Sequence, residues 1–438
     1  MLETLPIRLV QVHHEVAGST QAAIFGGSNP KAPTCFNRIG MLETTMVYLN
    51  LTQNGQEDAY TIINQTMKGF NHATVQDIFY EYSPAYLEKY RNRIPQTRQK
   101  VIDAIRSCRT FATGMIVYEC TGCGKNHHIF RSCGNRHCPT CQNQKGLDWL
   151  EHQLDIQVPG PYFMITFTVP ENIRSFFRSN QQIAYDGLFR ASSESMKKLA
   201  KDDKFIGGDV PGFFGVLHTW GRTLNYHPHI HYVVAGGAWS KDDHIWHPSR
   251  SDFYVPNRAL SRICRAKFRD KMIEAGLIDL IDPGVWHEAW NVNIQPVGAA
   301  EQSIRYLSHY VFKVAISDHR IVDVKNGMVT FSYQKTGSRR TRYMKLSALD
   351  FMSRFLQHCL PSGFMKIRYY GFMHGCSAIP IDHIRASIEM MHGFEVVVVD
   401  PKPEAPEKPE LSCPDCGCVL KYVYSVLPYQ MPNHRGSG

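Results

Sequence analysis

Two Cys-x-x-Cys pairs place the strongest constraint on how this chain folds. The first motif contains Cys120 and Cys123, the second contains Cys138 and Cys141, and fourteen residues separate the two motifs. Each Cys-x-x-Cys turn directs two thiolates toward one point, and two such turns supply the tetrahedral sulfur shell that zinc prefers. The spacing therefore predicts one structural zinc held by these four cysteines, with no ligand position left open for catalysis.

Further cysteines and histidines lie close to these pairs. Cys108, Cys133 and His137 form a candidate second zinc site, completed by His127 or His128. The alternative is that these groups are free thiols and surface histidines. A chain with 13 cysteines and no secretory leader is expected in a reducing cytoplasm, where disulfides do not persist.

Composition sets broad limits on the fold and on the partners. The chain has 438 residues, of which 43% are hydrophobic, so it can bury a large core divided over two or three domains. Its apolar runs are shorter than the roughly 18 residues that a membrane span needs, which predicts a soluble cytoplasmic protein without a membrane partner. The net charge of +9 permits a polyanionic partner without requiring one.

The sequence divides into four predicted regions. An N-terminal region of unknown role spans 1–73, and a helical zinc-binding and DNA-binding domain spans 74–155, with Pro84 and Pro95 expected to break its helices. A third domain spans 156–399. Residues 400–438 form a Pro-rich linker and a tail, where Cys413, Cys416 and Cys418 make an incomplete zinc site unless another residue joins them.

The third region contains the segment "HPHIHYVVAGG". Strands are predicted at 162–169, 212–220 and 229–237, with a helix at 180–200 and a turn around Leu224 joining the last two strands. Alternate residues of a strand share a face, so His229 and His231 point the same way and can bind one divalent cation. His218 on the partner strand is the expected third ligand, and His227 is its competitor. An isolated His-x-His strand is more commonly an exposed polar face.

A predicted helix within 298–317 carries Tyr306 and Tyr310, whose phenols lie one turn apart on the same face. The simpler interpretation is a pair of core tyrosines. The alternative is a pair of nucleophiles, because a phenol can attack a phosphodiester that a metal ion polarises. The metal site and the tyrosine pair support each other.

Basic side chains indicate contact with nucleic acid at two places. A predicted hairpin at 328–347 has a connection rich in lysine and arginine, suited to a DNA backbone. Arg136 belongs to the basic cysteine-rich segment. A solvated run of charge is the alternative at the hairpin, whose basic residues are Lys335, Arg339, Arg340 and Arg342.

Five motifs in order resemble one family. They are "CGNRHCPTCQ", "VLHTWG", "HPHIHYVVAGG", "YLSHYVFKVAIS" and "RFLQHCLPSGFMKIRYYG", and the resemblance covers about 75–375. The sequence resembles the rolling-circle transposases of the insertion sequence 91 type, which are two-tyrosine HUH endonucleases. The resemblance implies an α+β fold: a ferredoxin-like antiparallel sheet with flanking helices, preceded by a helical zinc-binding module.

The resemblance also implies the chemistry. His229 and His231 would be the HUH ligands of a catalytic Mg²⁺ or Mn²⁺, and Tyr306 and Tyr310 the nucleophiles. The expected reaction is nicking and strand transfer of single-stranded DNA at mobile-element ends and target DNA, through 5′-phosphotyrosine intermediates and without a nucleotide cofactor. Zn²⁺ would be structural, at one or two sites. The alternatives are a rolling-circle replication initiator or relaxase, and a non-catalytic zinc-finger DNA-binding protein.

Overall fold

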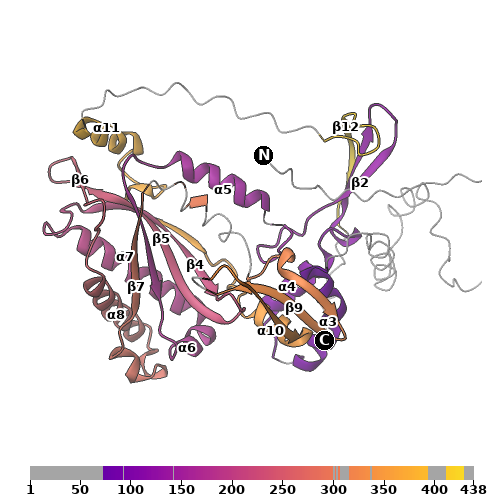
Figure 1. Cartoon of the computed structure of the whole chain (residues 1–438), viewed down its shortest axis with the longest axis horizontal. Helices are drawn as coiled ribbons and strands as arrows, with labels where there is room; N and C mark the ends of the chain where they lie inside the picture. Colours follow the sequence, from indigo (N-terminus) through magenta and orange to yellow (C-terminus); the bar gives the residue numbers. More distant parts are fainter. Residues whose placement is uncertain are drawn as a thin grey trace, which may run out of the picture. The chain divides into compact units, whose positions relative to one another are not determined.

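The computed structural model describes residues 73–91, 93–141, 143–298, 301, 304–305, 315–335, 338–392 and 411–428 (Figure 1). These residues belong to two compact units. One unit contains a three-stranded sheet whose strands come from distant parts of the sequence. The other contains a six-stranded sheet, a second three-stranded sheet and most of the helices. The two units interleave along the chain.

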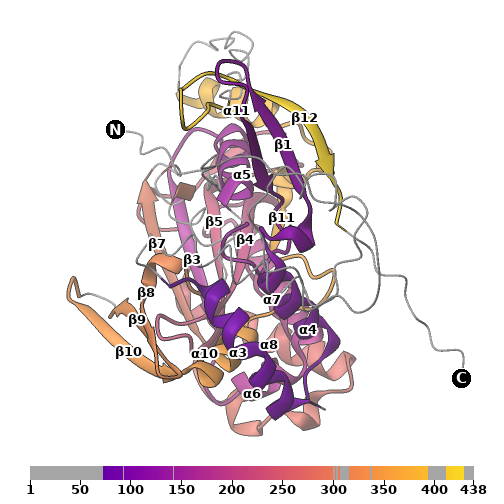
Figure 2. The ribbon, with the colours of Figure 1, turned by 90° about the vertical axis from the view of Figure 1, so that its right-hand side faces the viewer.

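The smaller unit is built around the strand order β12-β1-β2. Met115 and Val117 alternate with more exposed residues along the hairpin, and they pack with Phe130 into a small core. Strand β12 lies beside β1 (Figure 2) and pairs antiparallel with it, from Met115 opposite Val426 to Cys120 opposite Leu420. The elements are η1 (Phe111–Thr113), β1 (Met115–Cys120), β2 (Asn126–Phe130) and β12 (Leu420–Val426).

The main sheet of the larger unit has the strand order β11-β4-β5-β3-β7, with β6 paired to β5. The strand pairings of this sheet are antiparallel, and β5 is the middle strand of the five in this order. The strands are β3 (Tyr162–Thr168), β4 (Val210–Trp220), β5 (Tyr226–Trp239), β6 (Trp246–Pro248), β7 (Asn291–Gly298) and β11 (Ile367–Tyr370).

Helices cover both faces of this sheet (Figure 1). Phe163, Ile165 and Ile230 face α6, α7 and α8 in the largest core cluster. The opposite face contributes Val216 and Val233 to a second cluster, which includes side chains of α5 and α11. The period-two alternation of the strands therefore separates two cores. The helices are α5 (Asn143–Asp155), α6 (Arg174–Ser179), α7 (Gln181–Ala200), α8 (Asn257–Glu274) and α11 (Ile381–His392).

A second three-stranded sheet, ordered β10-β9-β8, lies with α3, α4 and α10 in the same unit. Phe79 of α3 packs edge-on against Phe355 of α10, with ring centroids 5.1 Å apart. The elements are α3 (Val75–Tyr90), α4 (Gln96–Ser107), β8 (Ile321–Lys325), β9 (Met328–Gln334), β10 (Thr341–Ser347) and α10 (Ala348–Leu356). Short 3-10 turns complete the unit: η2 (Ile278–Leu280), η3 (Pro283–Trp286), η4 (Asp318–Arg320) and η5 (Gly371–Met373).

Most of the predicted elements of the larger unit are confirmed, with one correction. The strands expected at 162–169, 212–220 and 229–237 and the helix at 180–200 appear as β3, β4, β5 and α7. Pro84 does not break the first helix, which runs on to Tyr90. Because Pro84 is exposed, water can satisfy the carbonyl that loses its helical hydrogen bond. Among the described helices, none is long and apolar enough to cross a membrane.

Candidate functional site

Three histidines meet on the middle of the main sheet. A turn closes at residues 221–225, where Leu224 adopts a positive φ of 61° and its N–H donates to the carbonyl of Gly221. The turn pairs Trp220 with Tyr226, and a shift of register between Trp220 and His218 then places His218 directly opposite His229. His231 follows on the same face as His229, with Ile230 fully buried on the other face.

The three imidazoles are close enough to share one ion. Each of His218, His229 and His231 offers a nitrogen, and these nitrogens lie within 4.8 Å of one another. The ring of His218 is centred 4.8 Å from that of His231 and 5.4 Å from that of His229. Among the described residues, His227 is not part of this group. The structure thus brings together the expected pair and the expected third histidine.

Hydrogen bonds orient two of these rings. The Nδ1–H of His229 donates to the carbonyl of His227 at 2.7 Å, so the lone pair of this ring lies on Nε2. Nδ1 of His231 lies 2.9 Å from Oγ1 of Thr166, its direct partner on β3. A bond at the far nitrogen is the usual way in which proteins fix a metal-binding histidine. Sequence reasoning missed Thr166, because its position opposite His231 depends on the register of a third strand.

Burial keeps the imidazoles uncharged. Loss of solvent lowers the pKa of His229 to about 3, and repulsion from His231 adds to the effect. Burial also lowers the pKa of His231 to about 4, with a further contribution from His227. The pKa of His218 falls well below its ordinary value for the same reason. All three rings are therefore neutral near pH 7, the form that binds a metal ion.

The cationic and aromatic surroundings of the site extend from β4 to β11. The ring of Trp220 stacks on that of His218, with centroids 5.2 Å apart and planes 19° apart. The ammonium group of Lys366 lies 4.7 Å from the centroid of the Trp220 ring. The N–H of Leu217 donates to the carbonyl of Lys366 at 3.0 Å, which fixes this lysine beside β4. Burial lowers the pKa of Lys366 to about 7, with a further contribution from Arg136, so this lysine beside the histidine site is only partly protonated near neutral pH.

The predicted nucleophiles Tyr306 and Tyr310 lie outside the described residues. Arg305, next to Tyr306, is exposed and pairs with Glu301, whereas Ile304 is buried in the core cluster on the histidine-bearing face of the sheet, with Phe214 and Val233. The chain therefore reaches this face two residues before Tyr306.

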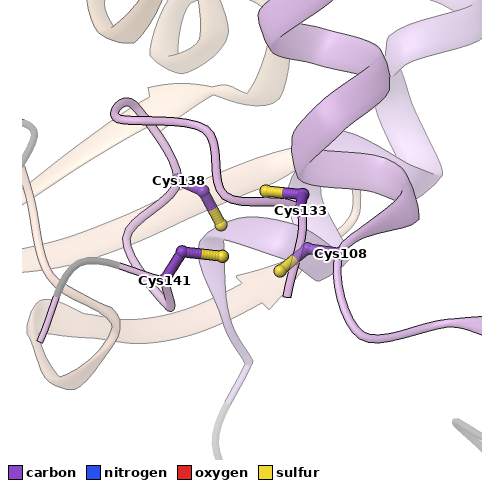
Figure 3. Close-up of side chains that lie close together, drawn as sticks. All are labelled: Cys108, Cys133, Cys138 and Cys141. Atoms are coloured by element: carbon purple, nitrogen blue, oxygen red, sulfur yellow. The ribbon is translucent and has the colours of Figure 1, made fainter. Parts of the chain in front are cut away.

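The cysteines form two clusters of four. Cys108, Cys133, Cys138 and Cys141 have sulfur atoms within 4.8 Å of one another, and Figure 3 shows the four side chains converging. A second cluster contains Cys120, Cys123, Cys413 and Cys416.

This arrangement corrects the predicted grouping, which joined Cys120 and Cys123 to Cys138 and Cys141. The reason is the hairpin, in which Cys120 lies at the turn end of β1 and Met115 pairs with Phe130 at the other end. Five residue steps of a strand span about 17 Å. Cys133, which follows β2, therefore lies near the end of the hairpin remote from Cys120.

Three further predicted site residues have other partners. Nε2 of His137 accepts the N–H of Leu360 at 3.3 Å, and burial lowers the pKa of His137 to about 3. The guanidinium of Arg136, expected at DNA, donates to the carbonyls of Pro361 and Phe364. His127 lies 3.3 Å from the sulfur of Cys413, and so belongs to the second cysteine cluster. The segment around 360–366 thus engages both Arg136 and His137 within the protein.

The predicted basic hairpin is present as β9 and β10 (Figure 2), paired from Gln334 opposite Thr341 to Met328 opposite Ser347. Its basic side chains are exposed at the end where the strands connect. Tyr343 on β10 is also exposed, to 64% of its surface. The exposed basic residues are Lys335, Arg339, Arg340 and Arg342.

Comparison with known proteins identifies the family. A family model described as a putative transposase matches residues 212–379, and one described as a transposase zinc-binding domain matches residues 78–169. The putative transposase y4qJ of Sinorhizobium fredii is 37% identical over 320 residues, which cover 68% of this chain and 80% of that protein. The transposase for insertion sequence element IS801 of Pseudomonas savastanoi pv. phaseolicola is 25% identical over 300 residues, covering 63% and 70%. No solved structure gives a significant match. The chain therefore belongs to the transposases of the insertion sequence 91 type, with a zinc-binding domain in its N-terminal part.

Proposed function

We propose that this transposase nicks and joins single-stranded DNA at the ends of a mobile element, as a metal-dependent HUH endonuclease. The observation that carries the proposal is the group formed by His218, His229 and His231 on the central strands of an antiparallel sheet. A central strand that bears the His-x-His pair, with helices on both faces, supports the ferredoxin-like HUH fold. Burial and neutrality are the properties that a ligand histidine needs.

The donor set suits a divalent cation. Three neutral imidazoles leave coordination positions for oxygen atoms of a phosphate and of water, and nitrogen ligands favour Mn²⁺ over Mg²⁺. A bound Mn²⁺ or Mg²⁺ supplies Lewis acidity at the scissile phosphate. The hydrogen bond between Nδ1 of His231 and the hydroxyl of Thr166, and the bond from Nδ1–H of His229 to the carbonyl of His227, hold the rings in place for the ion.

The nucleophile proposed from the sequence is a tyrosine, Tyr306 or Tyr310. Its phenolic oxygen forms a bond to phosphorus, its proton passes to solvent, and the bond from phosphorus to the 3′ oxygen breaks. The 3′ oxygen leaves as a hydroxyl, and the 5′ end remains as a phosphotyrosine. One phosphodiester replaces another, so no ATP is consumed. The buried position of Ile304 on the histidine-bearing face supports this assignment.

The exposed basic residues of the β9–β10 hairpin are proposed to bind the DNA backbone. Arg339, Arg340 and Arg342 lie at or beside the connection, where their guanidinium groups face solvent. Exposed Tyr343 on the same strand offers a ring on which a base can stack. Contacts of this kind bind single strands without reading their sequence.

A covalent adduct is the most direct test. A labelled single strand from an element end, incubated with the full chain and Mn²⁺, should yield a band that survives denaturation. His231→Ala should abolish this band, whereas His247→Ala, on β6 and paired with Asp243, should retain it. An adduct of normal yield with His231→Ala would remove the histidines from the reaction. Binding without any adduct in the unaltered protein would favour a non-catalytic zinc-finger protein.

The two enzyme alternatives differ in their products. A transposase supplied with both element ends should join strands from the two ends, whereas a replication initiator or relaxase acting on one origin should not. Strand joining is read from the lengths of the labelled products. Absence of joined strands in reactions that do form adducts would favour the initiator or the relaxase.

A further inference from the structure

We infer that Cys120, Cys123, Cys413 and Cys416 form a separate zinc ribbon, which fastens the C-terminal segment 411–428 to the β1–β2 hairpin. The family's zinc-binding model ends at residue 169, so it covers the first two cysteines and not the last two. The tail cysteines alone do not complete a zinc site, and the remaining ligands come from cysteines almost 300 residues earlier in the chain. This inference is independent of the proposed nicking reaction.

The two halves of the site have the same local structure. Their sequences are Cys-Thr-Gly-Cys-Gly at 120–124 and Cys-Pro-Asp-Cys-Gly at 413–417. In the first, the N–H of Gly124 donates to the carbonyl of Cys120 at 3.0 Å, and Gly124 has a φ of 67°. In the second, the N–H of Gly417 donates to the carbonyl of Cys413 at 2.8 Å, and Gly417 has a φ of 75°. Each glycine permits the positive φ that turns both thiols toward one point.

The distances between the sulfur atoms fit tetrahedral coordination. Cys123 and Cys413 have sulfurs 3.8 Å apart, and those of Cys120 and Cys416 are 3.3 Å apart. Zinc–sulfur bonds of about 2.3 Å at tetrahedral angles place neighbouring sulfurs about 3.8 Å apart. Both separations exceed the roughly 2.05 Å of a disulfide. All four cysteines are free thiols, so each can act as a ligand.

Hydrogen bonds around the sulfurs match those of a metal thiolate. The N–H groups of Gly122 and Cys123 both lie 3.4 Å from the sulfur of Cys120 and donate to it. A nitrogen of His127 lies 3.3 Å from the sulfur of Cys413. Donors of this kind stabilise the negative charge that ligated sulfur carries, and they orient it for the metal.

The two turns are also packed together tightly. A Cβ atom at Gly122 would lie 2.5 Å from the sulfur of Cys418, so position 122 has no room for a side chain. The N–H of Thr121 donates to the carbonyl of Val419 at 3.0 Å, and Lys125 pairs with Asp415 at 2.7 Å. Cys418 therefore packs beside the site, and it is not one of the four ligands.

The hydrophobic core at this end of the sheet is too small to hold the tail unaided. It consists of Cys120, Cys413 and Leu420, with Tyr118 and Leu411 partly buried against it. Units with so little core usually depend on a metal or on disulfides. Four sulfur ligands leave no open position, so the zinc is structural, and it ties β12 to β1.

Zinc content of the full chain tests the ligand set. Cys416→Ser should lower bound zinc by about one equivalent, whereas Cys416→His should retain it, because three cysteines and one histidine also bind zinc. Cys416 is exposed, so either side chain can be accommodated. Cys418→Ser is the matched control and should keep the full zinc content. Unchanged zinc in Cys416→Ser, or an equal loss in Cys418→Ser, would overturn the assignment.

Limited proteolysis tests the fastening of the tail in the same variants. Lys421 has an exposed side chain, but its backbone is paired with Glu119 of β1, which protects the following bond from trypsin. Cleavage after Lys421 should be at least tenfold faster in Cys416→Ser than in Cys416→His or in the unaltered chain. Equal cleavage rates in a Cys416→Ser chain that has lost zinc would show that the metal does not hold this strand.

Discussion

We expect the affinity of the proposed metal site to depend on the hydrogen bond between Thr166 and His231. Oγ1 of Thr166 lies 2.9 Å from Nδ1 of His231, and the two residues are direct partners across β3 and β5. Thr166→Val keeps the shape of the side chain and removes the hydroxyl. The ring of His231 then loses the group that fixes its tautomer and its orientation.

The expected loss of metal affinity can be estimated from other metal sites, in which ligand histidines have similar hydrogen-bond partners. Removing the hydrogen-bond partner of a ligand histidine typically weakens metal binding 10–100-fold, which is about 1.4–2.7 kcal/mol. Nδ1 is also left buried without its hydroxyl partner, so the free energy of unfolding should fall by about 1–3 kcal/mol. Both effects are expected to be absent in Thr166→Ser, which keeps the hydroxyl.

Calorimetric titration with Mn²⁺ measures the affinity directly, and the Mn²⁺ concentration that gives half-maximal nicking provides a second measurement. Thr168→Val is the matched control, because Thr168 lies two residues along β3 opposite His229, whose Nδ1 already binds the carbonyl of His227. This control should bind Mn²⁺ normally. If Thr166→Val binds Mn²⁺ as tightly as the unaltered protein, His231 does not depend on this bond, and the proposed ligand geometry is wrong.

Three further outcomes follow from the structure. Burial lowers the pKa of His358 to about 3, against about 6.5 in an unfolded chain, so stability present above pH 6.5 is lost as the pH falls toward 3. The loss should reach about 2 kcal/mol at pH 5, and His358→Gln should reduce by that amount the difference between the free energies of unfolding that urea titrations give at pH 7 and pH 5. Cys120→Ser and Cys141→Ser should each remove about one zinc and the double variant two, by metal analysis, because the residues lie in different clusters. Replacing Arg340 and Arg342 with alanine should weaken binding to all single strands alike and reduce the salt slope of the binding constant by about 1–2 in a fluorescence titration.

The histidine site could be predicted from the sequence because its geometry is local. Two strands joined by a turn of about five residues lie side by side, so a turn near Leu224 was enough to predict that His218 lies close to His229. A β-bulge between His218 and Trp220 shifts the register and sets the two histidines directly opposite, which the sequence did not predict. Period-two alternation then put His231 on the same face. Thr166 belongs to β3, some sixty residues earlier in the chain, and no turn connects its register to that of β5. Its role could not be found without the structure.

Arg136 and His137 show a second limit of sequence reasoning. Basic and metal-binding residue types beside a cysteine cluster indicate DNA contact and zinc ligation, and both interpretations assume that the side chains turn outward or toward the cysteines. In the structure they engage the backbone of the segment around 360–366, more than 200 residues away. A buried guanidinium or imidazole needs hydrogen-bond partners, and backbone carbonyl and N–H groups at that segment supply them. Residue type therefore predicted the chemistry of these groups, whereas long-range packing decided their partners.

For the cysteines, local spacing predicted one part of the arrangement and long-range strand pairing decided the other. Spacing along the chain correctly predicted that the two thiols of each Cys-x-x-Cys turn lie together, because local backbone geometry sets their positions. The spacing did not predict which of these turns meet. Once residues 126–130 pair with β1, the chain after the hairpin is carried away from Cys120, so Cys138 and Cys141 meet Cys108 and Cys133 at the far end. The thiols at the turn end then need ligands from elsewhere, and only a segment that extends the same sheet can bring them into position. The pairing of β12 with β1 does so, since Cys120 opposite Leu420 sets the tail turn beside the hairpin turn. The strand order β12-β1-β2 therefore determines which cysteines meet at the turn end of the hairpin.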